Sequence, residues 1–222
     1  MFKADALEAT PILQRALKKL LGYTPTTGRA GSDLRTACGD LSANAAVLIQ
    51  SDQVGPPLAE CFDLARATNI SQKQLAGVRN YVAKEKPVLL GAILVKQSII
   101  GFCLASEGLV ISDMTFASRE DVDVVKADLN AAFAIAEEVA ADDMAQMTYQ
   151  ALIKLHAAMI AYLSDTARPL PRMLAFQFAV AMPTLVTAQR LYYDPSRADE
   201  LRDENKVVHP AFMLPTGRAL SK

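Results

Sequence analysis

Apolar residues recur every three or four positions through the first three quarters of the chain, and this spacing predicts a succession of amphipathic helices. The first helix carries one apolar face, formed by Leu7, Leu13, Leu17, Leu20 and Leu21. The following segment, 22–31, is rich in Thr, Gly and Pro, which indicates a loop or flexible linker. We therefore expect residues 1–27 to form an N-terminal helix and linker.

Capping residues and prolines divide the next sixty residues into further helices. Ser32 suits the N-cap of an Ala- and Leu-rich helix that extends to about Gln50. Pro57 opens the next helix, because proline is well tolerated in a first helical turn. Ser71 caps another helix, whose apolar face consists of Leu75, Val78 and Val82.

Residues 88–105 form an apolar stretch that is about long enough to cross a bilayer. Lys96, Gln97 and Ser98 stand at its centre, where a charge is most costly in a membrane. We therefore expect a helix packed on nearly all sides within an assembly, with membrane insertion as the less favoured alternative.

The most periodic region begins after Ser118, which is followed by acidic residues that favour a helix N-terminus. Apolar residues then recur at helical spacing over 122–162 without an intervening proline. This pattern predicts one very long helix, or two helices with a break near Asp142 and Asp143. Together with the preceding helices, this region completes an expected helical body over 28–167.

The pattern changes at the start of 168–222, which we expect to form a separate module. Apolar residues alternate with small or polar ones over 174–180, the period of a β-strand. Two short helices follow, at 183–192 and about 196–204, and 217–220 returns as a strand. The expected fold class is mainly α: a long Ala-rich helical body followed by a small α+β module with the order β-α-α-β.

The composition is that of an ordinary globular protein, since 51% of the 222 residues are hydrophobic and 21% are charged. The formal net charge of −1 is not the electrostatic signature of a general nucleic-acid binder. Charge is unevenly distributed, however, because residues 106–143 carry ten acidic and two basic side chains between mildly basic ends. Such a pattern suits complementary contacts between copies or with partners.

Cys38, Cys61 and Cys103 are odd in number and widely spaced, so they indicate neither a disulfide framework nor a thiolate zinc site. We expect them to be small buried hydrophobic residues in a reducing compartment. The first residues also lack the order of basic and apolar positions found in a signal peptide, which argues against export by the secretory route.

Few residues suit catalysis, because His156 and His209 are the only histidines. We expect His156 to be an ordinary helical histidine and His209 to fix a loop by a hydrogen bond. No glycine-rich phosphate loop is present. The acidic residues of the periodic region are expected to face solvent, since no histidine joins them at metal-ligand spacing. These residues are Asp128, Glu137, Glu138, Asp142 and Asp143. The sequence thus favours a protein that is not an enzyme and holds no cofactor or metal.

Three segments of the C-terminal module share a pattern with a known family. Residues 192–197 read Tyr-Tyr-Asp-Pro-Ser-Arg and precede a helix that ends at Asn205. Residues 209–212 (His-Pro-Ala-Phe) and 217–220 (Gly-Arg-Ala-Leu) follow. These segments resemble the LysM pattern, which commonly has Gly where this chain has Tyr193.

The resemblance to LysM implies roles for single residues. Leu191, Leu201 and Leu220 would lie in the core, and Asn205 would bond turn backbone. A charged surface would dock to a neighbour through Arg197, Asp199, Arg202 and Arg218. The interface residues expected in this module are Tyr192, Arg197, Asp199, Arg202, Asn205, His209, Phe212 and Arg218.

A wider resemblance covers most of the chain. It rests on residues 31–41, 118–123, 149–152, 155–158, 167–172 and 205–220. In these segments the chain is similar to the C-terminal part of the Mu-type phage DNA circularization protein N family. That resemblance implies a structural protein of a contractile phage tail, with the LysM-like module as a protein-docking element.

The expected function is therefore that of a non-enzymatic tail component at the baseplate hub or around the tail tube. The expected partners are tube, hub and wedge proteins and further copies of the chain in a ring; nucleic acid and membrane are not expected partners. The expected location is the virion, after assembly in the cytoplasm of the host bacterium.

Two other functions remain as alternatives. The LysM-like module would bind N-acetylglucosamine chains of peptidoglycan if Tyr192, Tyr193 and Phe212 lined a sugar site. The family name instead suggests binding of genome ends in circularization, through basic residues. The basic candidates are Arg168, Arg172, Arg190 and Arg197.

Overall fold

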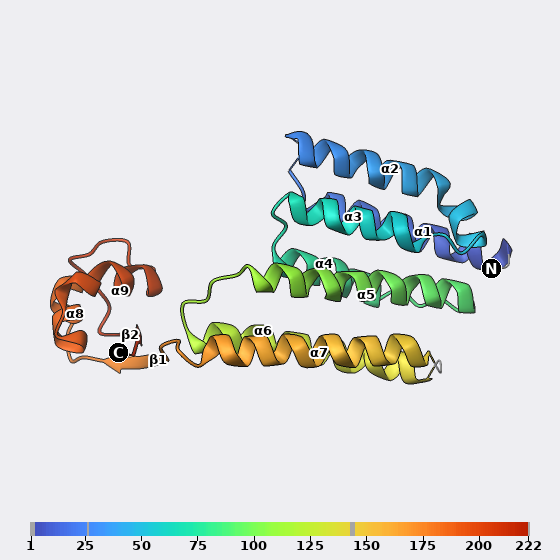
Figure 1. The fold of residues 1–222 in the computed structure, drawn as a ribbon. Helices are drawn as coiled ribbons and strands as arrows, with labels where there is room; N and C mark the ends of the chain where they lie inside the picture. Colours follow the sequence, from blue (N-terminus) through green and yellow to red (C-terminus); the bar gives the residue numbers. More distant parts are fainter. Residues whose placement is uncertain (1–2, 26, 143–144, 222) are drawn as a thin grey trace. The chain divides into compact units, whose positions relative to one another are not determined.

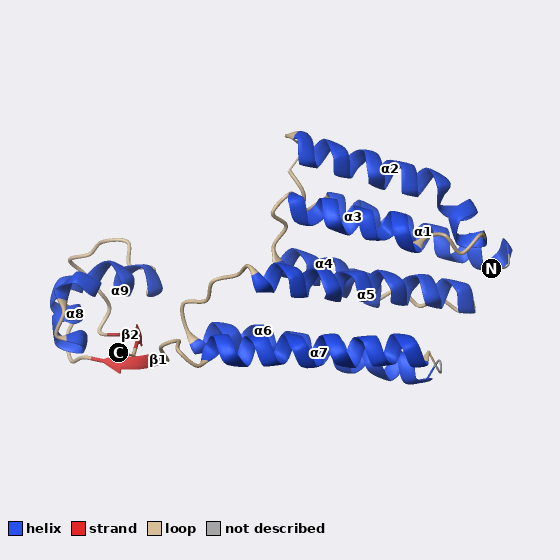
Figure 2. Ribbon diagram, viewed as in Figure 1, coloured by secondary structure: helices blue, strands red, loops and turns tan. Residues whose placement is uncertain are grey.

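The computed structural model describes residues 3–25, 27–142 and 145–221. The fold is mainly α with a small α+β part at the C-terminal end, as the sequence pattern predicted (Figure 2). The chain divides into two compact units, Met1–Met114 with Asn130–Met159 and Thr115–Leu129 with Ile160–Lys222.

The first unit opens with a group of helices around one core (Figure 1). They are α1 (Lys3–Leu21), α2 (Arg29–Gln50), α3 (Gly55–Ala67), α4 (Gln72–Ala83) and α5 (Leu90–Ser112). Helix α1 packs against α2, α4 and α5, and α3 packs against α2 and α5. Each helix buries at least one large aliphatic side chain in the shared core: Leu13, Leu34, Leu58, Leu75 and Ile99. Cys38, Cys61 and Cys103 are buried free thiols, as expected.

Helix α1 contributes its apolar face to this core. Leu13, Leu17 and Leu20 are buried as predicted, whereas the inclusion of Leu7 in the apolar face was wrong. Leu7 is 72% exposed, because the buried face passes through its neighbour Ala6, about 100° away around the helix. Small alanines at this face let α1 approach its neighbours closely.

Helix α2 begins three residues before the predicted N-cap at Ser32. Its N-cap is Gly28, whose φ of 93° is readily accessible to glycine alone. The predicted cap of α4 is confirmed: the Ser71 hydroxyl accepts from the Gln74 amide, and the Gln74 side chain accepts from the Ser71 amide.

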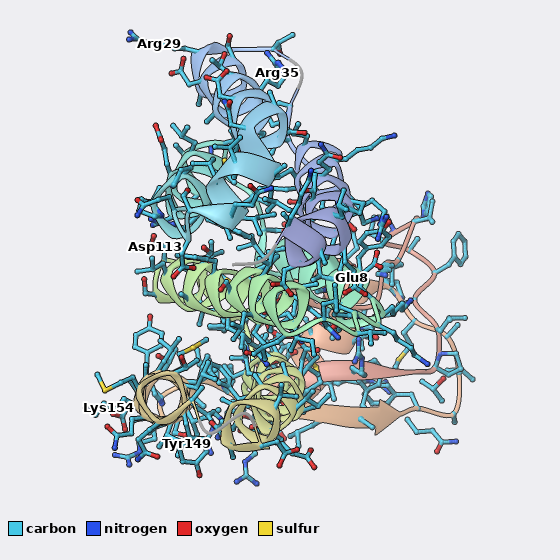
Figure 3. All side chains as sticks on the ribbon, turned by 90° about the vertical axis from the view of Figure 1, so that its right-hand side faces the viewer. Glu8, Arg29, Arg35, Asp113, Tyr149 and Lys154 are labelled. Atoms are coloured by element: carbon cyan, nitrogen blue, oxygen red, sulfur yellow. The ribbon has the colours of Figure 1, made fainter. Side chains whose placement is uncertain are left out.

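Helix α5 has its first amides capped by side chains of α1. Glu8 accepts hydrogen bonds of 2.8 Å from the amides of Val88 and Leu89, and Asp5 accepts one of 3.2 Å from Gly91 (Glu8 is labelled in Figure 3). These acceptors satisfy donors that a helix start leaves without an intrahelical partner.

The apolar stretch predicted at 88–105 is thus part of a core helix. By length and composition α5 is the one candidate membrane span among the described residues, and this is weak support for a span because core helices meet the same criterion. Ala92, Ile99 and Cys103 are fully buried within the unit. The helix is not packed on all sides within this chain, since Leu90 and Leu109 are exposed.

Helices α4 and α5 also share a buried ion pair. Arg79 Nε lies 2.8 Å from Glu107 Oε1, and Gln72 donates to Glu107 Oε2 at 3.1 Å. All three side chains are buried, so the charges are compensated within the core.

The periodic region forms two helices, α6 (Arg119–Asp142) and α7 (Gln146–Ala167), which lie side by side (Figure 1). The predicted break is confirmed; Asp143 lies outside the described residues. The predicted cap at Ser118 is also confirmed. The Ser118 hydroxyl accepts a hydrogen bond from the Asp121 amide, and the Asp121 carboxylate accepts from the amide and the hydroxyl of Ser118.

His156 of α7 is a packed histidine that contacts side chains of α6. Its ring stacks on Phe133 with centroids 4.6 Å apart, and its nitrogens lie 2.9 Å from Glu137 and 2.8 Å from Asn130. The expectation that Glu137 faces solvent is therefore wrong. Sequence spacing along one helix could not reveal this pair, because the histidine comes from the neighbouring helix.

The C-terminal module has the predicted β-α-α-β order. It consists of β1 (Met173–Gln177), α8 (Thr184–Tyr192), a 3-10 turn η1 (Pro195–Arg197), α9 (Ala198–Glu204) and β2 (Thr216–Leu220). The strands pair antiparallel, with Met173 opposite Leu220 and Gln177 opposite Thr216. The module has its own small core, formed by Ala188, Tyr192, Ala198, Leu201, Met213 and Ala219.

Several strand residues differ from their predicted environment. Strand β1 ends at Gln177, and both Leu174 and Val180 are exposed, because the module covers little of a two-stranded sheet and Val180 lies in the following loop. Leu201 is buried as predicted, whereas Leu191 and Leu220 are only half-buried. Ala219 supplies the buried position of β2 instead.

The start of α6 is fastened to the linker before β1. The Arg119 guanidinium donates to the carbonyls of Leu170 and Arg168 at 2.8 and 2.7 Å, and Glu120 accepts from the Met173 amide at 2.8 Å. Thr115–Leu129 accordingly belongs to the second compact unit.

Candidate protein-interaction surface of the C-terminal module

Two loops of the module lie side by side and are joined through their backbones. One loop connects β1 to α8, and the other connects α9 to β2. The hydrogen bonds run from Phe178 N to Pro215 O, from Met213 N to Met182 O and from Thr184 N to Pro210 O. Lengths of 2.7–3.0 Å are those of well-formed hydrogen bonds. The backbones of the two loops are therefore fixed to each other, independently of their side chains.

Large apolar side chains on these loops and on the first turn of α8 are exposed to solvent. Phe212 is 74% exposed, Leu214 70% and Val208 99%. We define the apolar loop surface as Val180, Leu185, Val208, Phe212 and Leu214. Large exposed apolar side chains on two loops that are bonded to each other favour a contact with another molecule.

His209 and Phe212 shape the second loop. His209 Nδ1 accepts a hydrogen bond of 3.2 Å from the Ala211 amide, and its ring lies 5.4 Å from the Phe212 ring, between centroids. Both residues are exposed, so they are available to a partner. His209 fixes its loop by a hydrogen bond, as the sequence predicted.

Tyr192 is placed in the core and not at the surface. It is only 4% exposed, and the Arg197 guanidinium lies 3.8 Å above its ring. Glu200 completes the cluster by accepting two hydrogen bonds from Arg197, at 2.7 and 3.1 Å. Burial, with a contribution from Glu200, raises the pKa of Tyr192, and the hydrogen bond to Glu200 raises that of Arg197. Tyr192 was therefore wrongly expected at an interface.

The second charged group of the module consists of pairs at its surface. Arg202 lies 2.9 Å from Asp199 and 3.0 Å from Asp203. The Arg218 guanidinium lies 2.9 Å from Glu204, and its side chain is largely exposed. These side chains can meet a partner, but exposed pairs of this kind contribute little to stability.

The Asn205 side chain links α9 to β2 by bonding their backbones, as the LysM resemblance implied. Its side chain accepts a hydrogen bond from the Arg218 amide and donates to the carbonyls of Arg218 and Leu201, at 2.7–2.8 Å. Gly217 lies against this side chain, and a Cβ atom at Gly217 would collide with Asn205 Oδ1 and the Phe176 ring. The Asn205 side chain thus stabilises the module through hydrogen bonds within it and does not itself serve as a contact to a partner.

The sequence pattern did not predict that Val180, Leu185, Val208 and Leu214 lie at the surface. Val180 was interpreted as part of a strand, and the other three were not singled out. A signal was present in the second loop, where an apolar run between Pro210 and Pro215 follows no helical or strand period. The backbone hydrogen bonds between the two loops hold the exposed side chains outside the core. These bonds join segments far apart in the sequence, so no local pattern predicts them.

In the part of the chain that the structure describes, no cluster of three or more His, Cys, Asp or Glu residues could hold a metal ion. The two histidines bond to different partners, as described above.

Comparison with known proteins leaves the resemblances as predictions. No protein-family model matches the chain, and no curated protein matches it.

Proposed function

We propose that this protein is a non-enzymatic structural component of a contractile bacteriophage tail. In this proposal the helical body packs against further copies in a ring, at the baseplate hub or around the tail tube. The C-terminal LysM-like module docks to a neighbouring tube, hub or wedge protein. The apolar loop surface carries the proposal, because it combines exposed Phe212 and Leu214 with a backbone-bonded scaffold.

The α6–α7 pair offers further apolar side chains for packing against other copies. Val124 of α6 and Met147 of α7 are mostly exposed. Long helices with apolar residues outside their own core are typical of chains that assemble with neighbours. The sequence resemblance to the Mu-type phage family supports a contractile phage tail as the assembly.

The test is co-purification with candidate tube, hub and wedge proteins after co-expression. Phe212→Ser in the apolar loop surface is expected to weaken capture of the docking partner about tenfold or more. Val47→Ser is the matched control, because Val47 is similarly exposed but lies on α2. Equal capture by both variants would remove the apolar loop surface from the proposal.

Peptidoglycan binding is a second candidate, favoured by the exposed aromatic rings of Phe212 and Tyr193. Aromatic side chains are common in ligand sites because they provide flat apolar contact area. Sedimentation with insoluble peptidoglycan tests it: binding that Phe212→Ala abolishes would favour the glycan function. No co-sedimentation of the wild-type chain would eliminate it.

A further inference from the structure

A pocket of about 400 Å³ lies within the first unit. Its volume falls in the range of about 300–1,000 Å³ that is usual for small-molecule sites. Most of its wall is apolar, with contributions from α5, α6 and α7. The large apolar residues of the wall are Ile93, Ile100, Ile135, Val139 and Leu152.

Two lysines give the pocket its charge. Lys96 comes from α5, and Lys86 comes from the segment before it. Lys96 Nζ donates a hydrogen bond of 2.8 Å to the backbone carbonyl of Glu85. Among the described residues, neither lysine forms an ion pair with a carboxylate.

The other charged groups at the pocket are committed to partners. Both carboxylate oxygens of Glu85 accept hydrogen bonds of 2.8 Å from Arg15, and Arg79 pairs with the buried Glu107. The pocket therefore carries excess positive charge next to an apolar wall. Glu85 and Arg79 each have a partner of opposite charge within the protein. An anion bound at the lysines would give Lys86 and Lys96 such a partner as well.

The environment of Lys96 points in the same direction. Burial lowers the pKa of its ammonium group, although the charge of Glu85 opposes this. The lysine has thus lost part of its hydration without gaining a carboxylate at ion-pair distance. A bound anion would offset this loss, whereas a bound cation would increase it.

We propose that this pocket binds a small amphipathic anion: a carboxylate or phosphate headgroup at Lys86 and Lys96, on an unbranched aliphatic tail. The tail covers Ile135 and Val139, which are 63% and 36% exposed. Asn80, Gln97 and Thr148 also line the pocket, but most of its wall is apolar, which suits an aliphatic tail better than a sugar or a nucleotide. This site is independent of the proposed tail function.

Calorimetric titration of the full chain tests the ligand class. Decanoate and decyl phosphate are the probes, and their relative affinities distinguish a carboxylate source from a phosphate source. Decanol and decyltrimethylammonium carry the same tail without the anion, and acetate carries the headgroup without the tail. At least one anionic probe is expected to bind, with an affinity about tenfold or more above that of each comparison compound.

Two variants locate the site. Lys96→Met removes the charge and keeps the length of the side chain, and Ala136→Leu fills the pocket from α6. Each is expected to weaken the better probe about tenfold or more, whereas Lys84→Met, an exposed lysine outside the pocket, leaves it unchanged. Circular dichroism confirms that each variant is folded; Lys86→Met replaces Lys96→Met if the latter is not.

Three results would overturn the proposal. They are the absence of binding by both anionic probes, equal affinity for decanol or decyltrimethylammonium, and unchanged affinity in the folded charge and pocket-filling variants.

Discussion

Asn205 shows how one side chain can hold a small module together. It bonds both backbone groups of Arg218 in β2 and the Leu201 carbonyl in α9. A module with so small a core has few other contacts between its helices and its second strand. The loop that carries Val208, Phe212 and Leu214 connects these two elements, so the shape of this part of the apolar loop surface depends on Asn205.

Asn205→Ala is expected to reduce the free energy of unfolding by about 1–2 kcal/mol, because the Arg218 backbone loses its partner. Urea unfolding measures the change, and hydrogen exchange at the Arg218 and Ala219 amides locates it. Asn44→Ala, an exposed asparagine of α2, is the control, with an expected change within about 0.5 kcal/mol. Indistinguishable variants would contradict the role of Asn205.

Tyr193 occupies a backbone conformation that suits the glycine of the LysM pattern. Its φ of 59° places it in the left-handed region at the end of α8. We expect Tyr193→Gly to be more stable than Tyr193→Ala by about 1 kcal/mol, because both lose the ring and only alanine retains the strain.

The same pair of substitutions at Gln189, an exposed helical position of α8, is expected to reverse the order, with alanine more stable by about 1 kcal/mol. Thermal unfolding of the four variants compares the two positions. The same order at both would show that φ at Tyr193 is not the cause.

Helix α5 is the element around which the first unit is organised. It contacts α1, α3 and α4, and its N-terminus lies against the acidic side chains of α1. Gly91 permits this approach: a Cβ atom there would lie 2.5 Å from Asp5 Cβ. Gly101, in the same helix, has open space around it.

Alanine is therefore expected to have opposite effects at these two glycines. Gly91→Ala should destabilise the chain by about 1–3 kcal/mol through overpacking, and Gly101→Ala should stabilise it by about 0.5–1 kcal/mol through helix propensity. Urea unfolding gives both values. Stabilisation by both substitutions would mean that α1 and α5 are not in close contact at Asp5.

At the level of elements, local signals predicted more than long-range ones. Ser71 and Ser118 were identified as caps because a cap depends on residues three positions away. Glu137 and Val180 were misplaced because their surroundings come from other parts of the chain, from α7 and from the loop before β2. The same reason explains why the pocket around Lys96, built from several helices, left no motif in the sequence.

For the whole molecule, charge alone does not define a docking surface. Several acidic residues of 106–143 have partners inside the chain: Glu107 pairs with Arg79, and Glu137 with His156. Others, such as Asp113 (Figure 3) and Glu138, are exposed. The exposed apolar residues of the α6–α7 pair and of the module therefore carry the assembly proposal, and exposed charges would add selectivity between partners.

The most direct test of the assembly proposal is cryo-electron microscopy of the chain co-expressed with candidate tail-tube and baseplate-hub proteins. The proposal predicts a ring with a fixed number of copies, in which the C-terminal module contacts a second protein through the apolar loop surface. A chain that stays monomeric and joins no such complex, yet binds DNA at low salt, would contradict the proposal and favour a role at genome ends.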